Sequence, residues 1–173
     1  MGGYRGTVRP MLLVMLLALL SACAPTSPAR EVAFVVDRIS TGEDYHATAT
    51  LPEHLEPDSF RGFGTAFKRR EGVTRSALDA VTFALEESPE PLMSNAEVTR
   101  RQVGDARIEE HQFLTGDLTF VWHAPAGVPG VWAECTVAIE GTTGGEVSRG
   151  AVREAQQVCA SYAVGGKVVR TDP

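Results

Sequence analysis

Several common patterns are scarce or missing in this chain of 173 residues. It has only two lysines, Lys68 and Lys167, and its formal net charge is −6. An acidic chain offers few of the basic patches that bind nucleic acids and anionic lipids, so we expect no nucleic-acid partner. The longest apolar run, residues 11–20, has ten residues, about half of what a transmembrane helix needs.

Familiar catalytic motifs are also missing. The chain contains no HExxH, GxSxG, SxxK or CxxC pattern. The densest ionisable cluster is Glu109-Glu110-His111, and on a strand Glu109 and His111 share one face while Glu110 takes the other. That arrangement is a poor three-ligand set and favours a solvated strand face. We therefore expect no catalytic residue, no cofactor and no metal site.

A hydrolase is the alternative that the histidines leave open. It requires His46, His111 or His123 to meet a serine or aspartate in a cleft. His123 follows Trp122, and we interpret it as a packing residue at the end of a strand.

The N-terminus reads as a targeting segment. Arg5 and Arg9 precede the apolar run without any acidic residue, and the small residues Ser21 and Ala22 follow it. A basic region, a short apolar region and a small-residue exit are typical of a secretory signal peptide, here residues 1–22. Its removal takes two arginines and changes the formal net charge from −6 to −8.

The first of the three cysteines follows directly. Leu20-Ser21-Ala22-Cys23 resembles the bacterial lipobox, which implies cleavage before Cys23 and attachment of acyl chains such as palmitate to that residue. The resemblance predicts a lipoprotein anchored in the cell membrane and facing outside the cytoplasm, with the lipid bilayer as its partner through Cys23. Residues 23–30, rich in proline and small residues, would be a flexible tether. Plain secretion after cleavage is the alternative.

The remaining sequence predicts one α+β domain over residues 31–165, followed by a tail at 166–173. We expect an antiparallel sheet of about six strands packed against two helices. Alternation and turn residues place the strands at 31–39, 45–51, 96–103, 106–114, 118–123 and 131–140. Helical spacing places the helices at 75–87, capped by Thr74 or Ser76, and at 148–162, capped by Ser148. Residues 53–72, with Phe60, Phe63 and Phe67, would form a loop with a helical turn.

The two remaining cysteines form a predicted pair. Alternation along 131–140 places Cys135 on the apolar face of its strand, and helical spacing places Cys159 on the apolar stripe of the last helix. Both sulfur atoms would then point into one sheet–helix interface, so we expect a disulfide. Disulfides are typical of exported proteins.

Two surface features carry weaker hypotheses. Trp122 and Trp132 flank the loop 124–130 and would form a patch for a partner or ligand if they project together, or pack against the helix at 75–87 if they do not. Lys68-Arg69-Arg70 beside the phenylalanines would lie on a membrane, or would simply be a solvated basic end.

Several short segments carry a family resemblance. The strand before Pro52 (45–52) resembles the opening of PsbP-like exported domains. Residues 103–107, the strand "LTFVWH", the Cys135 strand and the closing 158–162 are similar to type VII secretion-associated proteins of high-GC Gram-positive bacteria, although a tryptophan expected after Pro52 is replaced by Glu53-His54-Leu55. The resemblance implies a sheet flanked by helices and a non-catalytic role.

Together these patterns predict a membrane-anchored, non-catalytic binding or accessory module of the cell envelope, linked to secretion, whose partner is an envelope protein. Two alternatives stay open. One is a carrier or sensor of a small apolar ligand or lipid held between sheet and helix, which would need a sizeable apolar cavity. The other is an exclusion or immunity lipoprotein of a mobile element.

Overall fold

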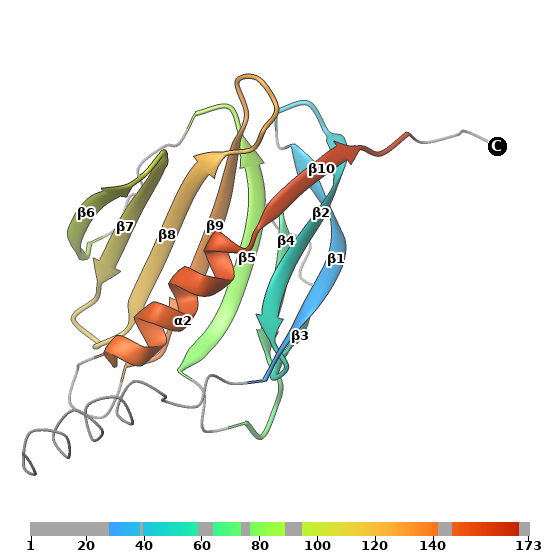
Figure 1. The fold of residues 1–173 in the computed structure, drawn as a ribbon. Coiled ribbons are helices and arrows are strands. Elements are labelled where there is room, and N and C mark those ends of the chain that lie inside the picture. The colour runs from blue at the N-terminus through green and yellow to red at the C-terminus, as the bar shows by residue number, and fades with distance from the viewer. Residues whose placement is uncertain are drawn as a thin grey trace, which may run out of the picture.

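The computed structural model describes residues 28–38, 40–58, 64–73, 77–88, 95–141 and 147–169. These residues form one mixed sheet of ten strands and one helix, α2 (Arg149–Ala160), which lies across one face of the sheet (Figure 1). The strands are β1 (Ala29–Arg38), β2 (Glu43–Pro52), β3 (Leu55–Pro57), β4 (Thr65–Arg69), β5 (Leu78–Glu86), β6 (Glu97–Val103), β7 (Ala106–Gln112), β8 (Leu118–Pro125), β9 (Trp132–Ile139) and β10 (Ala163–Lys167). The domain is therefore mostly β, and the expected six strands and two helices are corrected to ten strands and one helix.

The order of strands explains how distant segments meet. It runs β10-β2-β1-β5-β9-β8-β7-β6; away from this path, β4 pairs with β5 and β3 pairs with β4. All pairings are antiparallel except the short parallel contact between β1 and β5, at Arg38 and Leu85. The central strands β5, β9 and β8 place apolar side chains in the core on the face toward α2, and a row of polar side chains on the opposite face.

The first hairpin and the later meander are confirmed. β1 and β2 pair antiparallel along their whole length, joined by a turn in which Gly42 has a positive φ of 65°. β6, β7, β8 and β9 follow one another as antiparallel neighbours. β9 shows why such strands can be predicted from the sequence, since every second residue from Ala133 to Ile139 is buried.

The predicted helix at 75–87 is wrong, because its described part forms β5. The strand is paired along both edges, and Phe83, Ala84 and Leu85 are buried in succession, so its buried residues do not alternate cleanly. Leu78, Val81 and Leu85 therefore also fit a helical period, whereas the β-branched and aromatic residues Val81, Thr82 and Phe83 favour a strand. The expected caps Thr74 and Ser76 lie outside the described residues.

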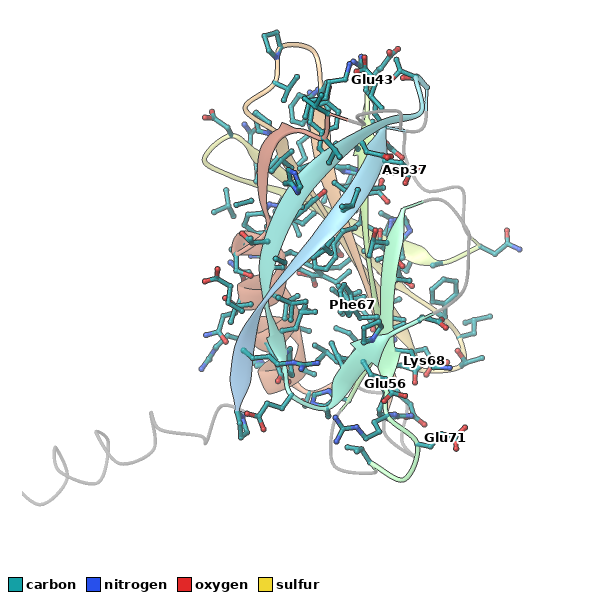
Figure 2. The ribbon with its side chains drawn as sticks, turned by 90° about the vertical axis from the view of Figure 1, so that its right-hand side faces the viewer. Asp37, Glu43, Glu56, Phe67, Lys68 and Glu71 are labelled. Carbon is teal, nitrogen blue, oxygen red and sulfur yellow. A yellow bond between two sulfur atoms is a disulfide. The ribbon has the colours of Figure 1, made fainter. Side chains whose placement is uncertain are left out.

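The predicted loop at 53–72 also contains strands. β3 pairs with β4, and β4 pairs with β5. Phe67 is buried on β4 rather than on a helical face, and Figure 2 shows it in the interior, while Lys68, Glu56 and Glu71 lie at the periphery. Phe60 and Phe63 lie outside the described residues.

The helix α2 closes the core, as the sequence predicts. The Ser148 hydroxyl accepts a hydrogen bond from the Ala151 amide at 3.1 Å and caps its first turn. Four residues of α2 are buried, namely Ala151, Ala155, Val158 and Cys159. They belong to the main core cluster, together with sheet residues such as Phe83, Phe120 and Val137. No helix in the described part of the chain has the length and apolar character to cross a membrane.

The strand β10 follows α2 and was not expected. It pairs with β2 from Ala163 opposite Thr48 onward and reaches Lys167, inside the segment predicted as a tail. Its glycines and exposed side chains give little strand signal.

Candidate functional site

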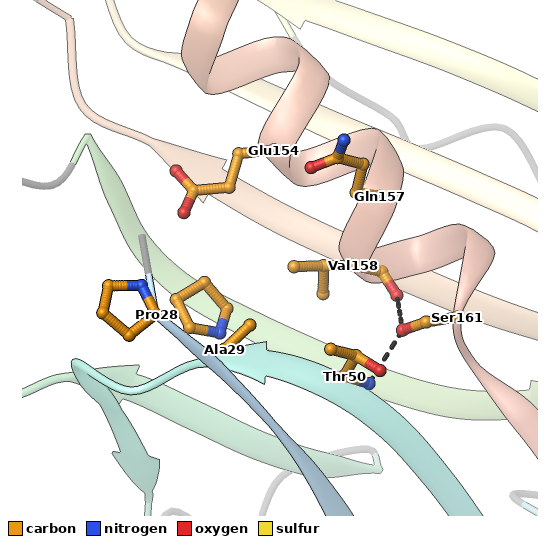
Figure 3. Close-up of a pocket in the computed structure, with 8 residues that line it drawn as sticks. Pro28, Ala29, Thr50, Glu154, Gln157, Val158 and Ser161 are labelled. Atoms are coloured by element: carbon orange, nitrogen blue, oxygen red, sulfur yellow. Dashed lines mark hydrogen bonds between the residues drawn. The ribbon is translucent and has the colours of Figure 1, made fainter. Parts of the chain in front are cut away.

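A groove of about 550 Å³ opens where strand pairing along the outer edge of β2 stops (Figure 3). β10 pairs with β2 only as far as Thr48, so α2 rather than a strand lies beside the end of β2. The groove is lined by Pro28, Ala29, Thr50, Pro52, Glu154, Gln157, Val158 and Ser161. The helix side of the groove is thus its last two turns, and the sheet side is the start of β1 and the end of β2.

Ser161 fixes the shape of this groove. Its Oγ accepts a hydrogen bond from the Thr50 amide at 2.8 Å and donates one to the Val158 carbonyl at 2.6 Å (Figure 3). One side chain therefore satisfies an amide that β10 does not reach and ties the end of α2 to β2.

The groove has an apolar floor and a polar rim. Prolines, Ala29 and Val158 supply the apolar surface, and Glu154 and Gln157 stand on the helix above it. Apolar surface with a few placed polar groups is typical of binding sites for small molecules and short peptide segments, and the volume falls in the same range. Glu154 brings a negative charge, so the groove favours a ligand that pairs apolar surface with a basic group.

A second polar cluster lies on the sheet face opposite α2. In the register, Glu134 of β9 stands between His123 of β8 and Ala84 of β5, and Glu86 lies two residues beyond Ala84 on the same face. The Nε2 atom of His123 lies 3.0 Å from Oε2 of Glu134, and Thr136 Oγ1 donates to Oε1 of Glu134 at 3.0 Å. One ligand atom from each of Glu86, His123 and Glu134 lies within 4.8 Å of the others.

The protonation of Glu134 follows from these contacts. Burial acts to raise the pKa of Glu134, but hydrogen bonds from His123 and Thr136 and the charge of His123 outweigh burial and hold the pKa below its usual value. Glu134 is therefore a carboxylate at neutral pH, next to a histidine that is only 3% exposed.

The structure joins Cys135 to Cys159 by a disulfide. The Cα atoms are 5.4 Å apart, and the bond ties β9 to the last turn of α2. Both residues belong to the core cluster, on the sheet–helix interface that the sequence indicated. Because stable disulfides form in oxidising compartments, the bond points to a location outside the cytoplasm.

The two tryptophans do not form one patch. Trp122 pairs with Cys135 and packs against the core on the α2 face, whereas Trp132 pairs with Glu86 and Pro125 on the opposite face. There the Arg107 guanidinium lies over the Trp132 ring, 5.1 Å from its centroid. Neither packs against a helix at 75–87, because the described part of that segment forms β5.

The Glu109-Glu110-His111 cluster divides between two faces, as predicted. Glu109 accepts a hydrogen bond from Arg100 at 2.8 Å and stands 3.1 Å from His111, while Glu110 pairs with Arg101 on the other face. His111 is fully buried rather than solvated.

The basic residues 68–70 are paired with acids. Lys68 contacts Asp58, Arg69 contacts Asp79 and Glu140, and Arg70 contacts Glu56. These ion pairs favour a solvated basic end over a membrane-binding surface. Cys23 and the predicted signal peptide lie outside the described residues.

Comparison with known proteins identifies the fold. No family model and no curated protein matches the chain in sequence. Among solved structures, the chain is similar to the Ran-binding protein Mog1p of Saccharomyces cerevisiae, with a TM-score of 0.53 and 10% identity over 80% of this chain and 96% of that chain. The domain therefore has a Mog1/PsbP-like fold. The PsbP-like resemblance is confirmed in part, at the level of the fold, although the sheet is mixed and carries one helix in the described residues rather than several. At this identity the likeness carries no partner or activity with it.

Proposed function

We propose that this chain is a lipid-anchored, non-catalytic binding module of the cell envelope, and that its groove between α2 and the β1–β2 hairpin receives a segment of an envelope protein. The location of the groove carries the proposal. Pro28 lines it and stands five residues after Cys23, the predicted site of acylation. Because an extended chain spans at most about 3.3–3.6 Å per residue, acylation of Cys23 would hold this end of the groove within roughly 18 Å of the bilayer.

Three observations support this function. The disulfide favours an oxidising compartment, which agrees with an exported chain. The similar solved structure is described as that of a binding protein. His111 and His123, two of the three histidines on which a hydrolase would depend, each stand beside a glutamate. Secretion machinery is one class of membrane partner that such a module would serve.

The chemistry of the groove defines the partner segment. Its apolar floor takes a short apolar stretch, and Glu154 on its rim favours a lysine or arginine next to that stretch. The Thr50 amide is already bound by Ser161, so side chains rather than an added strand would make the contact.

A small apolar ligand or lipid is the second candidate for the same groove. The space between sheet and helix, where the sequence predicts such a ligand, is filled by core residues such as Ala155, Phe120 and Cys135. The apolar floor beside Val158 offers another place for it. A role as an exclusion or immunity lipoprotein would use the same groove with a different protein.

Site-specific crosslinking in host membranes tests the proposal. A photoreactive phenylalanine analogue replaces Gln157, which lines the groove, and the matched control carries it in place of Gln102, which is exposed on the distant edge strand β6. We expect a discrete protein adduct from position 157 and none from position 102. A lipid adduct from position 157 would favour the carrier, and identical patterns from both positions, or no adduct, would contradict a binding groove.

A further inference from the structure

Three possible metal ligands meet on the sheet face opposite α2, away from the groove. They come from three adjacent strands, β5, β9 and β8, so the hydrogen-bonded backbone holds their relative positions. Glu86, His123 and Glu134 each place one ligand atom within 4.8 Å of the other two, and the His123–Glu134 distance is 3.0 Å.

These distances are close to those of a metal centre. Zinc binds imidazole nitrogen and carboxylate oxygen at roughly 2.0–2.2 Å, so two ligands of a tetrahedral ion lie about 3.3–3.5 Å apart. Glutamate side chains on fixed strands reach that separation by rotation about their own bonds.

The charges of the cluster also favour a cation. Two carboxyl groups and one imidazole, all able to bind a cation, meet in a place where His123 is only 3% exposed. Arg107 is the neighbour of His123 in the register, but its guanidinium stacks on Trp132. Thr136 holds the second oxygen of Glu134, as outer-sphere partners of metal ligands commonly do.

We propose that Glu86, His123 and Glu134 form a binding site for a divalent transition-metal ion, with Zn²⁺ as the ion of best fit. One imidazole nitrogen with two carboxylate oxygens suits Zn²⁺, whereas Mg²⁺ and Ca²⁺ prefer oxygen ligands alone. Three protein ligands leave a fourth position for water or for a group from another molecule. This site differs from the expectation of no metal, and it is independent of the proposed groove function.

Zinc binding by the detergent-solubilised full chain tests the site. After EDTA treatment and exchange into buffer, we expect calorimetric titration with ZnCl₂ to show one ion per chain. At a hundredfold excess over the dissociation constant, we expect the melting temperature to rise by roughly 5–10 °C. CaCl₂ and MgCl₂ should not reproduce the rise.

Variants separate this site from chance binding at other histidines. Glu86→Gln keeps the size of the side chain at the end of β5 and should reduce zinc affinity at least tenfold. His123→Gln should reduce it by a similar factor. Without metal, both variants should keep their fold, as measured by circular dichroism. His46→Ala, on an exposed position of β2, is the matched control and should bind zinc normally. Zinc binding that is absent, or that survives both variants and disappears with His46→Ala, would overturn the proposal.

Discussion

His123 and Glu134 form a buried pair that joins β8 to β9 on the face away from α2, with His123 Nε2 3.0 Å from Glu134 Oε2. They are direct neighbours in the register of the two strands. Because His123 is 3% exposed, water cannot readily replace either partner when the other is removed. The pair is therefore a structural contact even when no ion is bound.

This pair should show measurable coupling. We expect His123→Ala to lower the free energy of unfolding by about 1–3 kcal/mol, because Glu134 then loses its partner in a half-buried place. In a double-mutant cycle with Glu134→Ala, measured by urea unfolding in EDTA, the coupling should be about 0.5–3 kcal/mol. Additive effects of the two substitutions would show that the contact contributes nothing.

The Cys135–Cys159 disulfide should contribute strongly to stability. The two residues are 24 positions apart, and closing a loop of that length stabilises a domain by about 3 kcal/mol in the chain-entropy model. We expect reduction to lower the melting temperature by roughly 6–12 °C. Calorimetry with and without reductant measures the effect, and the Cys135→Ala/Cys159→Ala double variant is the control that reductant should not affect. An unchanged melt of the wild-type chain would contradict the prediction.

Gly64 and Gly72 offer a matched pair of substitutions. Both have a positive φ, 89° and 83°, so alanine strains the backbone at either position. At Gly64 a Cβ atom would also collide with the Phe83 carbonyl of β5, whereas at Gly72 it meets open space. We expect Gly72→Ala to cost about 1–2 kcal/mol and Gly64→Ala to cost about 1–3 kcal/mol more. Equal denaturation midpoints would show that Gly64 does not lie against β5.

The Arg100–Glu109–His111 chain should make stability fall in acid. Burial acts to raise the pKa of Glu109, but hydrogen bonds from Arg100 and His111 outweigh it and lower the pKa from 4.5. A carboxyl with a lowered folded-state pKa stabilises the fold above about pH 4.5, and the stabilisation is lost as pH falls through the folded value.

Replacing Arg100 tests that dependence. Arg100→Gln should remove about 0.2–1 kcal/mol at pH 6, because Arg100 is more than half exposed, and should flatten the loss of stability between pH 5 and pH 3. Urea unfolding across this range is the measurement. Arg101→Gln, which leaves the Glu109 contacts intact, is the control, and identical profiles for the two variants would contradict the assignment.

The sequence predicted the parts of the fold whose residues alternate or follow one helical face. β9 shows its pattern openly, since Cys135, Val137 and Ile139 are buried and Glu134 and Thr136 are not. β5 shows no clean alternation, because Phe83, Ala84 and Leu85 are buried in succession. The assignment of 75–87 as a helix therefore removed the central strand from the expected sheet.

The same error hid the polar cluster. Glu134 and His123 occupy adjacent strands of the predicted meander, so alternation alone could have placed them near each other. Glu86 joins them only through the register of β5 with β9, which no local pattern specifies. The groove likewise depends on where β10 stops pairing with β2. The glycines and exposed side chains of β10 do not predict a strand there.

The most direct test of the central claim, that Cys23 holds this domain at a membrane, is palmitate labelling and fractionation of the full chain in its host. Two or more acyl chains anchor a protein stably in a bilayer, whereas an exported chain without acyl chains lacks this anchor. We predict that the wild-type chain and the control variant Ser27→Ala are labelled and sediment with membranes, and that Cys23→Ser is unlabelled and released. Retention of Cys23→Ser in the membrane fraction, or an unlabelled wild-type chain, would contradict the anchor on which the proposed function depends.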